Sequence, residues 1–231
     1  MKINRILIVS AIVLMIFVTI NLLKEEAGID DYTGESILYL ISPFGKSEYH
    51  DLGVVDLEGE KVNLVTFRTK VLFVEDTEKI YSDLESFLPY KIERTISKFL
   101  EKEYITEEYD QNKFTVVIRK FKGKKLVKEQ IIKANGPIHN AITLPFYLRR
   151  LPSLEIGWHF TARVPSSAEF KLELVSIDEI TVPGGRFQAY HFKSTPDKFE
   201  IWINKDTPRV PLKIQSKGYT LLMKKYSPHN N

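Results

Sequence analysis

The sequence of 231 residues contains no cysteine. This absence excludes a disulfide bond, a thiolate nucleophile and a zinc site with cysteine ligands. It also excludes the lipid-modified cysteine of a bacterial lipoprotein signal. It does not decide the compartment, because an exported protein that needs no oxidation to fold can also lack cysteine.

The motifs of common catalytic, nucleotide and metal sites are absent as well. The chain has no G-x-S-x-G nucleophile elbow, P-loop, G-x-G-x-x-G or EF-hand loop. No two of its histidines have the spacing of a metal-binding pair; they are His50, His139, His159, His191 and His229. We therefore expect a non-enzymatic protein with no catalytic residue, no metal and no cofactor.

An excess of positive charge is also missing. Lysine and arginine number 33 against 30 aspartates and glutamates, which leaves a net charge of +3. A nucleic-acid-binding domain needs a clustered basic face, so we expect no nucleic acid partner. Hydrophobic residues at 43% and charged residues at 27% are typical of a globular chain.

The amino terminus carries the one long apolar run. Ile6 to Leu23 follows Lys2 and Arg5 and spans 18 residues, roughly 27 Å as a helix and close to the thickness of a bilayer core. No small-residue cleavage site follows the run. We expect an uncleaved signal anchor over residues 1–24, with the domain on the periplasmic side of the inner membrane; the alternatives are a cleaved export signal and a buried helix.

A polar linker over residues 25–34 precedes a single expected domain over residues 35–228. Alternating apolar and polar residues predict strands through most of it. They lie at about residues 36–42, 61–75, 113–121, 126–133, 158–164, 170–182, 187–193, 199–203, 210–214 and 219–226. Gly184-Gly185 predicts a tight turn, and a parity shift predicts a bulge near Ser176.

Helix is scarce in the expected domain. Residues 138–151 are the best candidate, with Pro145 as a kink and Asn140 as a cap; residues 91–103 fit either a helix or a strand. Two prolines make residues 210–214 an expected edge strand. The fold class expected is therefore mainly β: a curled antiparallel sheet with a short helical insert, preceded by one transmembrane helix.

Several stretches resemble a bacterial periplasmic family whose function is unknown. They are "IYSDLESFLPYKIERTI", "EEYD", "IHNAITLPFYLRRLP" followed by "IGWHF", "ITVPGGRFQAYHFKS" and "FEIWINKDTPRVPLKI". They follow the family's order between about Ser36 and Tyr226. The family groups with the LolA/LolB-like lipoprotein-carrier superfamily of half-barrels. The resemblance implies an incomplete β-barrel around the helical insert, with a concave apolar face, and it transfers no catalytic residue.

The resemblance and the strands with apolar residues on both faces together suggest a ligand cavity. We predict that it is lined by Phe146, Leu148, Trp158, Phe160 and Trp202. The alternative for each of these side chains is an ordinary place in the core.

Three functions remain open at this stage. The first is a membrane-anchored envelope protein that binds a lipid, a lipoprotein or another apolar ligand in the half-barrel. The second is an envelope scaffold that binds another protein through its sheet. The third and weakest is a hydrolase, because the sequence shows no convergent polar cluster.

Overall fold

The computed structural model describes residues 34–165 and 168–228. The expected signal anchor and all but the last residue of the expected linker lie outside the described residues. Within the described ranges, no helix is both long and apolar enough to cross a bilayer.

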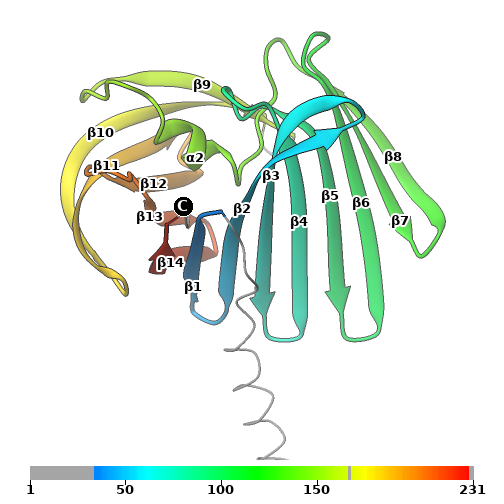
Figure 1. The fold of residues 1–231 in the computed structure, drawn as a ribbon, viewed down its shortest axis with the longest axis horizontal. Helices are drawn as coiled ribbons and strands as arrows, with labels where there is room; N and C mark the ends of the chain where they lie inside the picture. The colour runs from blue at the N-terminus through cyan, green and yellow to red at the C-terminus, as the bar shows by residue number, and fades with distance from the viewer. Residues whose placement is uncertain (1–33, 166–167, 229–231) are drawn as a thin grey trace, which may run out of the picture. The chain divides into compact units, whose positions relative to one another are not determined.

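One antiparallel sheet of 14 strands forms the domain, in the order β8-β7-β6-β5-β4-β3-β2-β1-β14-β13-β12-β11-β10-β9. The sheet curls strongly and does not close (Figure 1). The predicted class, a mainly β fold built on a curled antiparallel sheet, is therefore confirmed. The strands are β1 (Ser36–Ser42), β2 (Lys46–Leu57), β3 (Glu60–Val71), β4 (Val74–Ser82), β5 (Pro89–Lys98), β6 (Glu101–Asp110), β7 (Thr115–Lys122), β8 (Lys125–Lys133), β9 (His159–Val164), β10 (Ala168–Val182), β11 (Gly185–Thr195), β12 (Phe199–Asn204), β13 (Pro211–Ser216) and β14 (Tyr219–Ser227).

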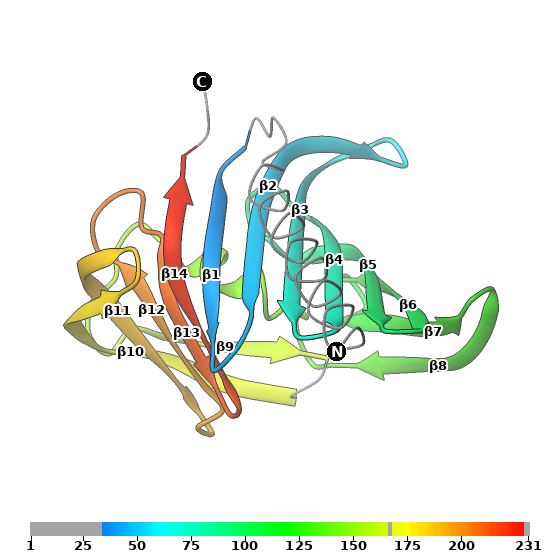
Figure 2. The same ribbon diagram turned by 90° about the horizontal axis from the view of Figure 1, so that it is seen from below.

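Strands that follow each other in the chain are neighbours in the sheet, with one interruption. The first and last strands, β1 and β14, pair with each other in the middle of the sheet (Figure 2). The interruption lies between β8 and β9, which form the two edges. Short sequential hairpins of this kind are the simplest way to build an antiparallel sheet.

The segment between β8 and β9 holds the helical insert, α2 (Leu144–Leu148). It is shorter than the predicted 138–151. Pro145 lies in its first turn, where a proline is tolerated. The N-cap of α2 is Thr143 and not the predicted Asn140. Asn140 instead caps the turn before the helix: its Oδ1 accepts hydrogen bonds from the backbone N–H groups of Ile142 and Thr143, at 2.7 and 3.1 Å.

Two groups of buried side chains contact α2 from different parts of the sheet. The first core contains Phe146 together with residues of β1 to β7 and β10 to β14, among them Tyr49, Val65 and Ile80. The second core contains Leu144 and Leu148 together with residues of β9 to β12. The insert thus fills the middle of the curl and gives both halves of the sheet a surface to pack on.

Two expectations about the amino-terminal half need correction. The expected strand over residues 61–75 is a hairpin, because the chain reverses at Leu72 and Phe73 between β3 and β4. The ambiguous stretch 91–103 is also a hairpin, with the reversal at Phe99 and Leu100 between β5 and β6. Neither loop contains a glycine, proline, asparagine or aspartate, which are the residues that normally mark a turn.

The expected edge position of residues 210–214 is wrong. β13 is an interior strand that pairs with β12 and β14. Pro211 is the first residue of β13 and lies where the pairing with β12 shifts register between Trp202 and Ile203. A proline is accepted at such a position because no ladder hydrogen bond from its nitrogen is needed.

The predictions for β10 and β11 are confirmed. Their pairing shifts between Leu174 and Ser176, which is the expected bulge. The chain reverses after Val182, and Gly185 adopts a φ of 140°. The bulge lets one long strand contribute first to the second core and then to the first.

Candidate functional site

A cavity of about 410 Å³ opens on the concave side of the sheet. Its walls come from β1 to β5, β13, β14, α2 and the segment before α2. Most of the lining is apolar, from Ile41, Phe67, Val71, Ile142, Ile214 and Leu221. The volume is within the range of about 300–1,000 Å³ that is usual for small-molecule sites.

The inner end of the cavity is built from aromatic rings. Phe146 of α2 stacks on Tyr49 with their centroids 3.8 Å apart, and only Phe146 of this pair lines the cavity. Tyr39 also lines it and donates a hydrogen bond from its hydroxyl to the carbonyl oxygen of Pro211 at 3.0 Å. These contacts hold Phe146 and Tyr39 in place on the cavity wall.

A charged cluster forms a second wall of the same cavity. It consists of Asp76 and Glu78 on β4 and Arg94 on β5, and we call it the Arg94 cluster. Glu78 and Arg94 are direct partners in the β4–β5 register. Arg94 donates to Asp76 from Nη2 at 2.5 Å and from Nε at 3.0 Å, and its Nε lies 3.3 Å from Glu78 Oε1.

Glu78 is the unusual member of the Arg94 cluster. Burial raises the pKa of its carboxyl to about 7, and the neighbouring charges of Asp76 and Glu107 act in the same direction. The Arg94 guanidinium opposes this shift but is already bound by Asp76. The cluster therefore keeps a carboxyl group that is only partly ionised near neutral pH beside an apolar space.

A buried ion pair lies behind the aromatic end. Both guanidinium nitrogens Nη1 and Nη2 of Arg149 donate to the carboxylate of Glu35, which lies just before β1. Both side chains are almost fully buried, and the Tyr226 hydroxyl donates to the same carboxylate at 3.4 Å. Arg149 thus joins the end of α2 to the start of the sheet.

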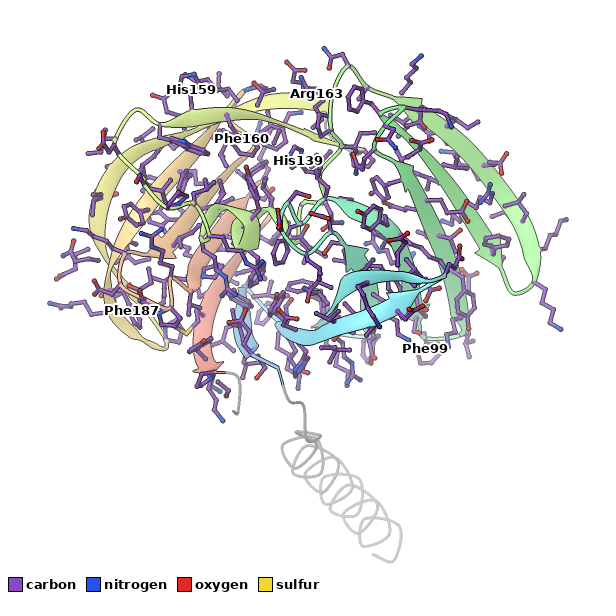
Figure 3. The ribbon with its side chains drawn as sticks, turned by 45° about the horizontal axis from the view of Figure 1, so that its top comes forward. Phe99, His139, His159, Phe160, Arg163 and Phe187 are labelled. Atoms are coloured by element: carbon purple, nitrogen blue, oxygen red, sulfur yellow. The ribbon has the colours of Figure 1, made fainter. Side chains whose placement is uncertain are left out.

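The five predicted lining residues occupy different places. Phe146 lies on the cavity, whereas Leu148 is fully buried in the second core. Trp158 and Phe160 pack against that second core with their rings 5.6 Å apart. Figure 3 shows Phe160 near His139, and their rings are 5.6 Å apart. Trp202 is buried in the first core. The structure therefore does not bring the five side chains together.

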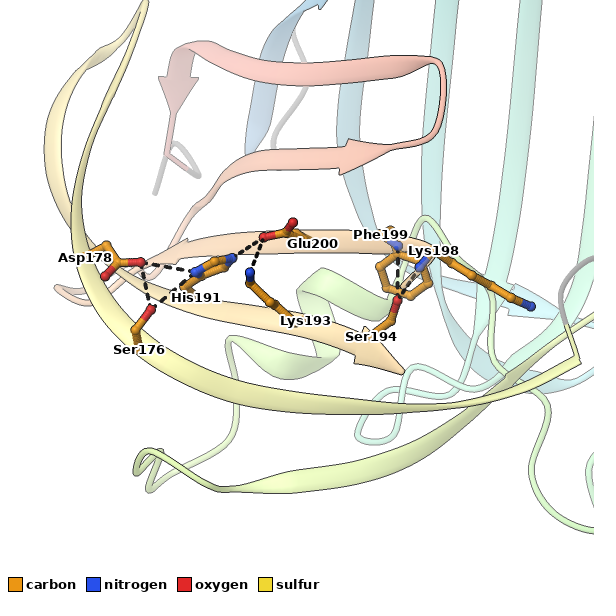
Figure 4. Close-up of polar contacts among 8 residues, drawn as sticks. All are labelled: Ser176, Asp178, His191, Lys193, Ser194, Lys198, Phe199 and Glu200. Carbon is orange, nitrogen blue, oxygen red and sulfur yellow. Dashed lines mark hydrogen bonds and ion pairs between the residues drawn. The ribbon is translucent and has the colours of Figure 1, made fainter. Parts of the chain in front are cut away.

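A convergent polar cluster that the sequence did not reveal lies on β10, β11 and β12 (Figure 4). His191 Nε2 lies 2.5 Å from Glu200 Oε2, and its Nδ1 lies 3.1 Å from Asp178 Oδ2. The Ser176 hydroxyl donates to Asp178 at 2.7 Å. The imidazole ring stacks on Trp202 with the centroids 4.2 Å apart.

This geometry does not suit a serine nucleophile. The Ser176 hydroxyl lies 3.3 Å from His191 Nδ1, but both nitrogens of His191 also face carboxylate oxygens, those of Asp178 and Glu200. The hydroxyl proton of Ser176 is directed at Asp178, so the hydroxyl-to-imidazole hydrogen bond of an activated serine is missing. The contacts instead tie three adjacent strands together. Across residues 34–165 and 168–228, no three His, Cys, Asp or Glu side chains converge as a possible metal site.

Sequence reasoning missed the Arg94 cluster because the turn at Leu72 and Phe73 was not recognised. Once β4 is known to begin at Val74, alternation places Asp76 and Glu78 on the face of the buried Ile80. Two carboxylates on the strand face that points to the core are unusual, and this is the sequence signal for the cluster. Their partner Arg94 depends on the pairing of β4 with β5, which local patterns do not supply.

Comparison with known proteins finds a family and a fold. The sequence model of a family described as "Protein of unknown function (DUF3108)" matches residues 54–219. The crystal structure of a beta-barrel-like protein of the domain of unknown function DUF1849 from Brucella abortus is similar, with a TM-score of 0.50 and 8% identity over 84% of this chain and 95% of that one. At this identity the likeness concerns the fold alone. No curated protein matches.

The expected family of unknown function with a barrel-like fold is confirmed in this coarse form. The predicted relationship to the lipoprotein carriers stays a prediction.

Proposed function

The chain belongs to the DUF3108 family, and we propose that it is a non-enzymatic envelope protein that binds a lipid-like, amphipathic molecule in its concave cavity. The observation that carries this proposal is the pairing of an apolar space with a polar wall in one cavity. An acyl chain would contribute roughly 0.8 kcal/mol for each buried methylene group. Part of that gain is offset by the entropy lost on association.

The Arg94 cluster supports a ligand with a hydrogen-bonding head group. Asp76 and Glu78 outnumber Arg94, and the Ser47 and Thr69 hydroxyls, 2.8 Å apart, lie on the same cavity. A head group that donates hydrogen bonds, such as an amine or a hydroxyl, matches these acceptors. This chemistry sets the orientation of the ligand in the cavity: the head group lies at the Arg94 cluster, and the apolar part lies against Phe146, Ile214 and Leu221.

The proposal includes the location of the domain. The apolar run Ile6–Leu23 would hold the domain on the periplasmic side of the inner membrane, or would direct its export before removal. A tethered domain cannot cross the periplasm as a soluble carrier does. Its role would therefore be local, in taking up or presenting a lipid at the membrane that holds it.

A filled cavity tests the proposal. Val71→Trp places an indole in the cavity, while Thr66→Trp adds the same group on the opposite face of β3, where alternation directs the side chain away from the cavity. We expect a fluorescent fatty amine or fatty alcohol to bind saturably to the wild type and Thr66→Trp, and at least tenfold more weakly to Val71→Trp. Equal binding by all three proteins, or no saturable binding, contradicts the proposal.

A second function is favoured by the edge of the sheet. Nearly every residue of β8 is exposed, including Ile131 at 67%, and the far side of β8 has no partner strand among the described residues. An envelope protein could therefore add a strand to β8. Ile131→Lys would weaken capture of such a partner in a crosslinking pull-down and leave fatty amine binding unchanged.

A further inference from the structure

Large apolar side chains are exposed at three neighbouring hairpin tips. Leu72 and Phe73 form the loop between β3 and β4, and Phe99 and Leu100 form the loop between β5 and β6; each is 79–88% exposed. Phe44, in the loop between β1 and β2, is 67% exposed. All three loops lie at the same end of the sheet, the lower end in Figure 1, and we call them the hairpin-tip surface.

The backbone at two of these tips disfavours the residues found there. Leu72 has a φ of 52° and Phe99 a φ of 27°, in the left-handed region where glycine and asparagine are preferred. Other hairpins of this sheet place glycine in the loop, as Gly59 between β2 and β3 and Gly123 between β7 and β8. Bulky apolar residues at these tips are unfavourable for the turn conformation and for solubility. Their presence therefore indicates a functional role for the tips.

Lysines surround the apolar tips. Within two residues of these three loops and of the β7–β8 loop beside them there are seven lysines and two glutamates, which leaves five net positive charges against +3 for the whole chain. Four of the lysines also lie within 4.0 Å of a carboxylate on the same or a neighbouring strand. Register pairs Lys46 with Lys70 across β2 and β3, and Lys98 with Val74 across β4 and β5. The lysines are Lys46, Lys70, Lys98, Lys102, Lys122, Lys124 and Lys125.

We propose that the hairpin-tip surface inserts into the interfacial region of a lipid bilayer, with its lysines on anionic head groups. Apolar tips inside a basic rim match the bilayer interface, where acyl chains lie beneath negatively charged head groups. The β3–β4 and β5–β6 tips border one open groove of about 630 Å³, and the acyl chains of a fluid layer can fill this groove and close around the tips. A folded protein partner would instead need a continuous complementary surface.

The length of the chain before β1 is compatible with this contact. Twelve residues, 24–35, separate the apolar run from Ser36. Fully extended they reach roughly 40 Å. Ser36 lies at the end of β1 opposite Phe44, and the seven residues of β1 span roughly 23 Å. A bilayer that holds residues 6–23 can therefore also meet the tips. The contact does not require a ligand in the cavity.

The absence of cysteine makes a direct test simple. The full chain, reconstituted in phosphatidylcholine vesicles with phosphatidylglycerol, is labelled with a polarity-sensitive fluorophore at Phe73→Cys or Leu100→Cys. The control is Glu60→Cys, an exposed site next to the loop at the other end of the sheet. We expect a blue shift and quenching by nitroxide lipids at the two tip sites only. Emission typical of water at both tip sites overturns the proposal. A blue shift that appears without vesicles and grows with protein concentration also overturns it, because a second copy of the chain would then cover the tips.

A second variant separates membrane contact from folding. Leu72→Gly/Phe73→Asn places glycine at the loop residue with positive φ, as in a type II′ hairpin turn, so its unfolding midpoint should equal or exceed that of the wild type. We expect it to reduce nitroxide-lipid quenching of a label at Leu100→Cys several-fold. Unchanged quenching in this stable variant contradicts the proposal. If neither tip label is quenched when the other tip residues are wild type, and fatty amine binding is intact, the membrane contact alone is overturned and the proposed ligand function stands.

Discussion

Replacing Glu78 with glutamine should stabilise the fold at neutral and alkaline pH and have no such effect in acid. Burial, with help from Asp76 and Glu107, raises the pKa of Glu78 from 4.5 to about 7. Between these values the folded state binds more protons than the unfolded state. Stability therefore falls as the pH rises through this window.

The size of the effect follows from the width of the window. One pKa unit corresponds to about 1.4 kcal/mol, so ionisation of Glu78 costs about 3 kcal/mol above about pH 7. The side chain is only 14% exposed, so solvent screening reduces this figure little. Against the total stability of about 5–15 kcal/mol that is usual for a domain, the effect is measurable.

A pH titration of the wild type alone would conceal this effect. Burial lowers the pKa of His139 from 6.5 to about 4, so the unfolded state binds the extra proton between these values. Stability is then lost as the pH falls, by a similar amount of about 3 kcal/mol and with the opposite sign. Only the difference between wild type and Glu78→Gln isolates the carboxyl group.

The assay is urea unfolding followed by tryptophan fluorescence, at several values between about pH 4.5 and pH 8. Glu75→Gln is the matched control, because Glu75 lies on the other face of β4 and Arg68 lowers its pKa. The stability advantage of Glu78→Gln should grow with pH, while Glu75→Gln should show no such gain. A difference between Glu78→Gln and wild type that is constant across the range would refute the role of ionisation.

Three further predictions concern packing and charge. Arg149→Met should cost about 3–5 kcal/mol of unfolding free energy because it leaves Glu35 buried without its partner, and Glu35→Gln/Arg149→Met should recover most of the loss in urea unfolding. Gly184→Ala should cost about 1–3 kcal/mol, because its Cβ would lie 2.6 Å from Met223 Sδ; an additive loss in Gly184→Ala/Met223→Ala would show that this contact is not the cause. His139→Gln should remove the loss of stability between about pH 6.5 and 4, and an unchanged acid limb of the stability profile would contradict the burial of a neutral imidazole.

The parts of the fold that could be predicted are those in which local chemistry matches the tertiary structure. β7 is rich in β-branched residues, β12 has Phe199, Ile201 and Ile203 on one face, and glycine marks the turn at Gly123. The bulge in β10 was readable because the core parity changes on either side of it. In each case the residues that form the strand, turn or bulge are also the residues from which it can be predicted.

The wrong predictions lie where function or long-range contacts decide the structure against the local sequence preference. The loops at Leu72 and Phe99 carry no turn residue, so two hairpins were not recognised. Pro211 suggested an edge because a bulge in the partner strand is invisible from one segment. The family resemblance predicts a concave apolar face, but of the cavity walls the sequence predicts only Phe146, because the rest depends on which strands become neighbours.

The two ends of the cavity differ in a way that affects how a ligand could exchange. Phe146 closes one end, while Ile41, Val71 and Tyr219 lie at the ends of their strands that meet the hairpin loops. With the hairpin-tip surface in a bilayer, this open end would face the lipid. A chain of ten methylenes that left the membrane through water would meet a cost of roughly 8 kcal/mol, and a mouth at the interface removes that step. Exchange would then be set by lateral diffusion in the membrane and not by solubility in the periplasm.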